Sequence, residues 1–269
     1  MMHIMKDIDG RKSMNILAVG DVVNESGLAF LRKKLRGLQR LVGADFTVVN
    51  GENAAGTGIL PRQANEILDA GADVVTLGNH AFRRKEICPY LDDSPYILRP
   101  LNLAPQVPGR GWGEYDSPMG PVMVVNLIGR CGMDFGPDNP FLAVERLLKE
   151  HAPRFVLIDF HAEATSEKLA MAYLLDGRVS ALWGTHTHVQ TSDGAVFPKG
   201  TGYITDLGMT GPALSVLGVK AEQSIRMFMG DPYVPFSGAP GPAKLECAVF
   251  TLDDATGLCT EVRALRIEE

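Results

Sequence analysis

Two histidines separated by one residue, His186 and His188, follow a short apolar segment, residues 179–183, that predicts a buried strand. Because side chains alternate faces along an extended backbone, we expect both imidazoles to point the same way where the strand gives way to a loop. Imidazole nitrogens are common ligands of transition metals. The pair therefore predicts one part of a metal site.

Other predicted strands also end in polar side chains that can bind metal. Their ends carry Gly20-Asp21, Gly51-Glu52-Asn53, Gly78-Asn79-His80 and His161-Ala162-Glu163. Ligands in open α/β sheets bind outside the carboxyl ends of the strands, so these ends together predict one shared site. Glycine before the polar residue permits the sharp turn that aims a side chain into such a site.

The candidate ligands exceed what one tetrahedral ion needs. They are Asp21, Glu52, Asn79, His161, His186 and His188. Mixed carboxylates and imidazoles suit Mn, Fe or Zn better than Mg or Ca, and the set is large enough for two ions that share a carboxylate. Two ions about 3.5–4 Å apart can clamp a phosphate while a bridging hydroxide attacks it.

Each candidate also has a purely structural interpretation when it is taken alone. Asp21 could cap a helix, Asn53 could support a turn, and His161 could be a hydrogen-bonded residue at a strand end. Their recurrence at successive strand ends favours the metal site.

The elements that must position these residues alternate between apolar strands and amphipathic helices. We expect strands at 16–22, 45–50, 74–77, 122–127, 155–160, 179–183, 202–205, 245–252 and 261–267. We expect helices at 26–42, 61–70, 84–91, 140–150 and 165–175. The pattern predicts an α/β protein in which two sheets pack face to face between helices. Residues 1–13 are expected to form a disordered extension, and residues 14–269 a single domain.

Composition excludes several classes of function. The 269 residues carry a net charge of −6 with no basic block, so we expect no stable nucleic-acid binding, whereas a small phosphoester remains a suitable partner. No apolar run approaches the ~20 residues that span a bilayer, so we expect no membrane association. The four cysteines form no C-x-x-C pair, which indicates reduced thiols in a cytoplasmic protein.

The motifs Gly20-Asp21, Gly78-Asn79-His80, the lone His161 and Gly184-Thr185-His186-Thr187-His188 resemble those of the calcineurin-like metallophosphoesterases. The longer strings at 50–56, 159–168 and 200–212 resemble the YmdB-like branch of that family, and the resemblance runs from Met14 to the C-terminus. It implies a four-layer α/β fold with two mixed sheets sandwiched between helices. It also implies homo-oligomers and a binuclear centre of divalent or trivalent ions, most often Fe or Mn. The implied reaction is hydrolysis of 2′,3′-cyclic nucleotides to the 3′-phosphate, and in some members of 3′,5′-cyclic nucleotides.

The resemblance also implies a role for each motif residue. Asp21, Glu52, Asn53 and His188 would hold the first ion. Glu52 would bridge to a second ion completed by Asn79, His161 and His186, with His80 as the catalytic histidine.

The chain departs from the broad family at three positions. The usual Asp-x-His is Asp21-Val22-Val23, the bridging acid is Glu52 rather than aspartate, and Ala81 stands where an acid often follows the histidine. The first two changes match the YmdB-like branch, and the third leaves open which group orients His80.

Three other functions fit parts of the sequence. The protein could be a phosphatase of another phosphoester, or a regulatory metal-binding protein with weak or no catalysis. An amidohydrolase also carries His-x-His, but early, on its first barrel strand, whereas here the pair follows residue 180.

Two loops and three aromatic residues could border a substrate. Residues 55–58 could form a flexible lip, and residues 205–209 could flank the pocket. Phe82, Phe135 and Trp112 could stack a base, although core packing is the better interpretation of each.

Overall fold

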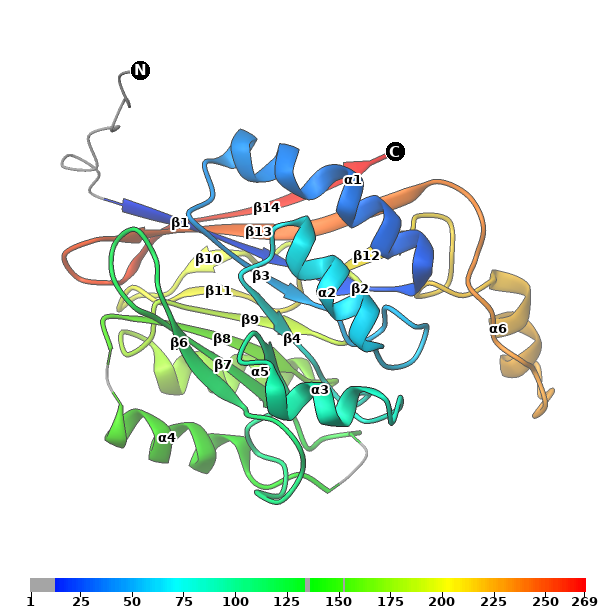
Figure 1. Ribbon diagram of the computed structural model, residues 1–269, viewed down its shortest axis with the longest axis horizontal. Coiled ribbons are helices and arrows are strands. Elements are labelled where there is room, and N and C mark those ends of the chain that lie inside the picture. Colours follow the sequence, from blue (N-terminus) through cyan, green and yellow to red (C-terminus); the bar gives the residue numbers. More distant parts are fainter. Residues whose placement is uncertain (1–12, 134–135, 152) are drawn as a thin grey trace.

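The computed structural model describes residues 13–133, 136–151 and 153–269 as two packed β-sheets covered by helices (Figure 1). The first sheet has eight strands in the order β2-β12-β13-β1-β3-β4-β5, with β14 paired to β13. Its strands are β1 (Ser13–Val19), β2 (Asp21–Val22), β3 (Phe46–Asn50), β4 (Val74–Thr76), β5 (Ile97–Leu98), β12 (Met209–Pro212), β13 (Ala243–Asp253) and β14 (Cys259–Glu268).

The second sheet has six strands in the order β10-β11-β9-β8-β7-β6. They are β6 (Trp112–Tyr115), β7 (Val122–Ile128), β8 (Phe155–His161), β9 (Ala181–Thr185), β10 (Ala195–Val196) and β11 (Gly202–Ile204). Both sheets are mixed, because β1-β3-β4-β5 and β7-β8-β9-β11 are parallel while β13 and β6 run antiparallel to their neighbours.

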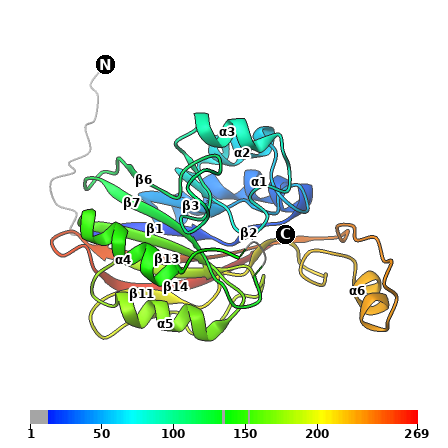
Figure 2. The same ribbon diagram turned by 90° about the horizontal axis from the view of Figure 1, so that it is seen from below.

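Three buried apolar clusters divide the molecule into four layers. One lies between the first sheet and the helices α1 (Asn24–Val42), α2 (Pro61–Ala70) and α3 (Ile87–Asp93). A second lies between the two sheets. The third lies between the second sheet and the helices α4 (Pro140–Glu150) and α5 (Thr165–Leu175), on the opposite side of the molecule (Figure 2). The predicted four-layer α/β fold is confirmed.

Strand β1 shows how alternation builds two of these cores at once. Leu17 and Val19 join the cluster under the helices, whereas Ile16 and Ala18 join the cluster between the sheets. Successive side chains point to opposite faces, and both faces are covered, so the strand is apolar throughout.

Local signals account for the helix boundaries that the sequence predicted correctly. Pro61 begins α2, where its missing N–H costs no hydrogen bond, and Asn139 caps α4 by accepting from the backbone N–H of Phe141 and Leu142. Gly43, at φ 63°, ends α1 in the left-handed conformation that glycine adopts readily.

Other expected boundaries need correction. Helix α3 begins at Ile87 rather than at residue 84, because Arg84 lies in a turn and its guanidinium donates to the carbonyls of Ala55 and Thr57. Ser13, assigned to a disordered extension, begins β1, where it pairs with Asp253. The rest of that predicted extension, residues 1–12, lies outside the described residues. Helix α6 (Ala221–Phe228) was not predicted.

Among the described residues, none of the helices combines the length and the apolar character needed to cross a membrane.

Candidate metal centre

The motif residues meet at one edge of the two sheets. Pairing of Asn50 with Thr76 brings the ends of β3 and β4 level, and pairing of His161 with Thr185 does the same for β8 and β9. Asn50 donates from Nδ2 to the Asp159 carboxylate over 3.1 Å, which joins the two sheets at this edge. The resulting pocket, of about 530 Å³, is lined by Glu52, Asn53, His80, His186 and His188 among others.

Three atoms that can bind metal converge on His161 Nε2 at the floor of the site. Its Nε2 lies 3.0 Å from Asn79 Oδ1, 3.1 Å from His186 Nδ1 and 3.2 Å from Glu52 Oε1. Ligand atoms of Glu52, His161 and His186 all lie within 4.8 Å of one another, a spacing that can hold a metal ion. His161 and Glu52 are fully buried.

A second group forms around Asp21. Its Oδ1 lies 3.6 Å from His188 Nε2 and accepts no hydrogen bond from the described residues, although the carboxylate is fully buried. Its Oδ2 accepts from the backbone N–H of His186 over 3.2 Å. A buried carboxylate oxygen without a hydrogen bond is costly, so this oxygen is available to a cation.

Glu52 lies between the two groups. Its Oε1 is 3.2 Å from His161 Nε2 and also accepts from Asn53 Nδ2 over 3.1 Å, and Asn53 Nδ2 is in turn 3.2 Å from His188 Nε2. This carboxylate is thus placed to share its oxygens between both groups.

Each histidine of the site has its outer nitrogen engaged by a protein oxygen. His188 Nδ1 donates to the carbonyl of Leu217 over 3.1 Å, and His186 Nε2 lies 3.1 Å from the Glu163 carboxylate. His161 Nδ1 lies 2.9 Å from Thr185 Oγ1, and that hydroxyl in turn donates to Asp159. This arrangement fixes the tautomer and directs the inner nitrogen of each ring to the centre, as in metal-bound histidines.

Asn53 supplies the group that orients His80, which the sequence left open. His80 Nδ1 donates to Asn53 Oδ1 over 2.7 Å, and the His80 backbone N–H donates to Glu52 Oε2 over 3.1 Å. With Nδ1 held in this way, Nε2 is the nitrogen left for a substrate in the pocket.

The backbone of the His-x-His segment differs from the expected extended strand. Strand β9 ends at Thr185, and His186 and His188 have φ of 100° and 60°. Positive φ is uncommon for residues with a side chain and persists where surrounding contacts impose it. The two imidazoles therefore reach the site from a turn, not from the alternation of a strand.

Electrostatics reflect a dense group of buried charges. Burial alone raises the pKa of Asp21 and of Glu52, but the neighbouring imidazoles outweigh it and hold both below their ordinary values. Burial lowers the pKa of His161, yet Glu52, Asp21 and Asp159 together raise it to about 9. Burial also lowers the pKa of His80, and with His161 nearby it lowers that of His186 to about 4.

Two buried acids support the site: Asp159, to which the sequence assigned no role, and Asp206, in the segment 205–209 expected to flank the pocket. Asp159, in the middle of β8, accepts from Thr185 and Asn50, and burial raises its pKa to about 6. Asp206 accepts from the backbone and the hydroxyl of Thr187 and pairs with the buried Lys168 over 2.8 Å. An acid inside an otherwise apolar strand is the signal that could have found Asp159.

Glycine at position 78 leaves the space that His161 and Glu52 occupy. A Cβ there would clash with both side chains, so we predict that Gly78→Ala loses bound metal and about 1–3 kcal/mol of stability, the usual cost of overpacking a core. The matched control is Gly37→Ala, in the interior of α1 with no atom within 4 Å, which should gain about 0.5–1 kcal/mol. Thermal unfolding and metal content would be measured for both variants. Equal stability and equal metal content would refute the role of Gly78 in leaving space for His161 and Glu52.

The other predicted pocket residues divide between the site and elsewhere. Ala55, Gly56 and Thr57 of the predicted lip line the pocket, whereas none of residues 205–209 does. Asp206 of that segment accepts hydrogen bonds from Thr187, which lines the pocket. Phe82 packs against the core under the helices. Phe135 lies outside the described residues.

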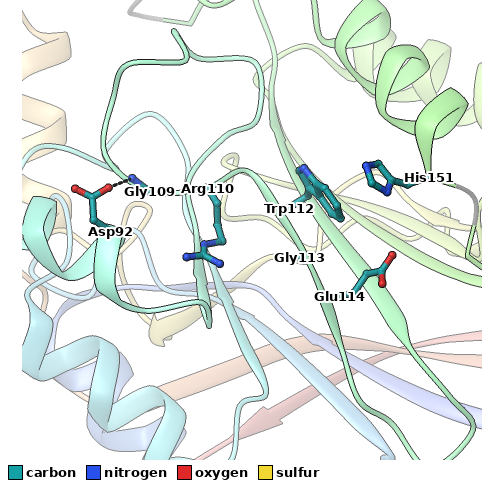
Figure 3. Close-up of a pocket in the computed structure, with 7 residues that line it drawn as sticks. All are labelled: Asp92, Gly109, Arg110, Trp112, Gly113, Glu114 and His151. Carbon is teal, nitrogen blue, oxygen red and sulfur yellow. Dashed lines mark hydrogen bonds between the residues drawn. The ribbon is translucent and has the colours of Figure 1, made fainter.

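Trp112 lies in a different hollow, with its ring 4.4 Å from that of His151 (Figure 3). Asp92, Arg110 and Glu114 also line that hollow, and none of the candidate metal ligands does.

The model of the family described as YmdB-like protein matches residues 17–265. The chain belongs to the YmdB-like family. A 2′,3′-cyclic-nucleotide 2′-phosphodiesterase of Bacillus subtilis (strain 168) is 41% identical over 261 residues, 95% of this chain and 98% of that protein. The family predicted from the motifs is confirmed.

Solved structures of similar proteins agree with the YmdB-like fold. A hypothetical protein from Thermus thermophilus matches with a TM-score of 0.90 at 40% identity, over 95% of this chain and 100% of its own. A novel phosphatase from Mycoplasma pneumoniae matches with a TM-score of 0.91 at 32% identity, over 96% and 94% of the two chains.

Proposed function

We propose that this YmdB-like protein is a binuclear metal-dependent phosphodiesterase that opens 2′,3′-cyclic nucleotides to the 3′-phosphate. Its class, a hydrolase of phosphoester bonds, follows from the family and its relatives. The name of the Bacillus subtilis relative supports the substrate and the bond. Hydrolysis of 3′,5′-cyclic nucleotides is a further activity that the family resemblance suggests. A phosphatase of another phosphoester is the second candidate, favoured by the name of the Mycoplasma pneumoniae structure.

The observation that carries this proposal is the common orientation of His161, His186 and His188. Each outer nitrogen faces a protein oxygen. The inner nitrogens of His161 and His188 face oxygens of Asn79, Glu52 and Asp21, and that of His186 lies 3.1 Å from His161 Nε2. Neutral imidazoles and carboxylates suit Fe or Mn, and Zn is compatible. The residues present therefore fit two metal ions, and the unpartnered Asp21 Oδ1 supports this.

The first ion would be held by Asp21, Asn53, His188 and Glu52, and the second by Glu52, Asn79, His161 and His186. Asn53 directs its Nδ2 to Glu52 and His188 and its Oδ1 to His80, so ligation through Oδ1, which has a second lone pair, would require the amide to rotate towards the ion. Ions bound there would activate a water for attack and offset the charge of the phosphoryl oxygens.

The residues around the ions would position the substrate and move one proton. A phosphate seated at the centre places its leaving ribose oxygen within reach of His80, which lines the pocket. His80 Nδ1 keeps its proton for Asn53, so the proton given to that oxygen as the bond to phosphorus breaks would come from Nε2 of the imidazolium form. Burial lowers the pKa of His80, which favours release of this proton. The strained five-membered ring of a 2′,3′-cyclic phosphate lowers the demand on this acid.

Metal affinity should rise with pH up to about 9, because His161 carries a proton below that pKa in the metal-free protein. The ion binds only neutral imidazole, so below this value each pH unit lost lowers the apparent affinity about tenfold through this proton. Burial lowers the pKa of His188, but Asp21 outweighs burial and raises it, so this ligand adds to the proton released by His161. Mn²⁺ calorimetry at pH 7 in two buffers of different ionisation enthalpy should show at least about one proton released per chain. Affinity that does not change with pH would contradict the assignment of His161.

Metal removal and restoration test the function directly. Protein treated with a chelator should lose hydrolysis of 2′,3′-cyclic AMP and regain it with Mn²⁺, with two ions per chain measured by mass spectrometry. Activity that survives complete removal of metal would overturn the proposal.

We also propose a cytoplasmic homo-oligomer, as the sequence and the family resemblance suggest. All four cysteines are free thiols, which supports a reducing compartment. Phe228, Met229 and Tyr233 are each at least 80% exposed, and such apolar clusters mark interaction surfaces. Analytical ultracentrifugation tests the assembly, and a monomer at micromolar concentration would refute it.

A further inference from the structure

One wall of the pocket comes from a segment to which the sequence assigned no role. Residues 213–242, here called the arm, leave the first sheet after β12, form α6 and return to β13 (Figures 1 and 2). Most of the arm projects beyond the sheets, but its two ends face the candidate metal ligands. Pocket-lining residues on the arm are Leu217, Val219, Phe236, Ser237 and Gly238.

Backbone hydrogen bonds hold the two ends of the arm together beside the pocket. Val216 and Val219 exchange both of their backbone hydrogen bonds at 3.0 Å, which closes a tight turn. Lys220 N donates to Ser237 O over 3.2 Å, and Ala239 N donates to Gly218 O over 3.0 Å. The segment that carries Phe236 is therefore fixed to the turn that carries Leu217.

The turn between Val216 and Val219 is also anchored to the candidate metal centre. The carbonyl of Leu217 accepts the hydrogen bond from His188 Nδ1, and that of Gly218 accepts from Asn24 Nδ2 over 3.1 Å. Leu217 has φ of 53° and Gly218 has φ of 100°, and this turn presents the Leu217 carbonyl to the imidazole. The wall thus has a fixed position relative to the reacting end of the pocket.

The chemistry of the wall is opposite to that of the metal centre. Val23, Leu217, Val219 and Phe236 are apolar, whereas the other side carries Glu52, the histidines and Glu163. Phe236 is 49% exposed and Leu217 48%, so this apolar surface is open to water in the free protein. A ligand that joins a phosphate to a flat, weakly polar ring would match both sides, and the volume of about 530 Å³ falls in the range of small-molecule sites.

We propose that Phe236, with Leu217 and Val219, forms the nucleobase-binding wall of this site. The inference rests on the proposed phosphodiesterase function and names the nucleoside part of its substrate. Among the described pocket-lining residues Phe236 is the one with a phenyl, phenol or indole ring, since Phe82 is in the core and Trp112 lies in the other hollow. A base stacked on an aromatic ring is worth about 1–3 kcal/mol and tolerates any base, so we expect little preference among the four nucleotides.

Kinetics with and without a base test this wall. Phe236→Ala should lower kcat/KM for 2′,3′-cyclic AMP by roughly 5- to 150-fold, mainly through KM. It should leave kcat/KM for methyl riboside 2′,3′-cyclic phosphate, which has no base, unchanged. Phe236→Trp should retain activity on both. The matched control is Tyr173→Ala, on α5 and 66% exposed, which does not line the pocket and should change the kcat/KM of neither substrate.

Equilibrium binding gives a second readout that does not depend on turnover. In calorimetry with the metal-loaded protein, Phe236→Ala should lower the affinity for 3′-AMP by the same factor. The affinity for inorganic phosphate should not change. Equal losses of kcat/KM on both substrates and of affinity for both ligands would contradict the assignment of Phe236 to a base-binding wall. No loss in any of these measurements would also contradict it. If the wild type hydrolyses neither substrate, the proposed function fails, and the binding comparison still decides whether the wall holds a base.

Discussion

Replacing Glu52 by glutamine is expected to lower hydrolysis of 2′,3′-cyclic AMP by about 10³-fold or more. Glu52 is the acid that touches both groups of candidate ligands, through His161 on one side and Asn53 on the other. Glutamine keeps the size of the side chain but not its charge, so two cations would face each other with a neutral amide between them. Stabilisation by metal is worth several kcal/mol, and each 1.36 kcal/mol is about tenfold in rate.

Metal content and fold must be measured beside the rate. Glu52→Gln should bind fewer than two ions per chain while its circular dichroism spectrum remains that of the wild type. Glu222→Gln, on the exposed face of α6, is the matched control and should retain full activity. A Glu52→Gln protein that holds two ions and hydrolyses the substrate at the normal rate would contradict the role of Glu52 as a carboxylate shared by both ions.

Replacing His80 by alanine is expected to lower kcat for 2′,3′-cyclic AMP by about 10²–10⁴-fold, the usual contribution of a general acid. Metal content should stay at two ions, because none of the converging ligand atoms belongs to His80 and its Nδ1 faces Asn53. The kcat for bis(4-nitrophenyl) phosphate, whose leaving group departs without a proton, should fall less than about tenfold.

This comparison separates proton donation from a role in metal binding. A donor role predicts a large loss only where the leaving oxygen needs a proton. If kcat falls equally on both substrates and the metal content stays normal, His80 stabilises charge instead of donating a proton. If the variant loses metal, His80 contributes to metal binding. His151→Ala, remote from the site and beside Trp112, should leave both rates unchanged.

The fold was predictable because its signals are local. The boundaries of α2, α4 and α5 agree with the sequence, since Pro61 and the Asn139-Pro140 pair mark two of the starts. The site was predictable in outline for a related reason. Parallel strands bring their carboxyl ends to one edge, so Glu52, Asn79 and His161 meet once the strands are placed correctly.

The details that the sequence did not yield depend on contacts between distant residues. The left-handed backbone at His186 and His188 is held by Asp21, which is 165 residues from His186, and by the Leu217 carbonyl. Asp159 meets Asn50 across 109 residues and between two sheets. No periodicity in either segment encodes such a pairing.

The arm was missed although Ala221, Ile225 and Phe228 recur on α6 with helical spacing. Phe228 and Met229 at the end of α6 are more than three-quarters exposed, and Ser224 is the helix residue that is buried. Packing against a core, from which amphipathic helices are recognised, therefore contributes little here. The segments that flank the helix carry the contacts that matter for the pocket, and they have no regular secondary structure over most of their length.

The central claim, a metal phosphodiesterase acting on cyclic nucleotides, is tested most directly by phosphorus NMR of 2′,3′-cyclic AMP with the Mn-loaded protein. We predict that the cyclic resonance disappears and that a single monophosphate, 3′-AMP, replaces it. The same sample with Asp21→Asn should show the cyclic phosphate unchanged. A persistent cyclic resonance with wild-type protein that holds two ions would contradict the claim and favour another phosphoester as the substrate.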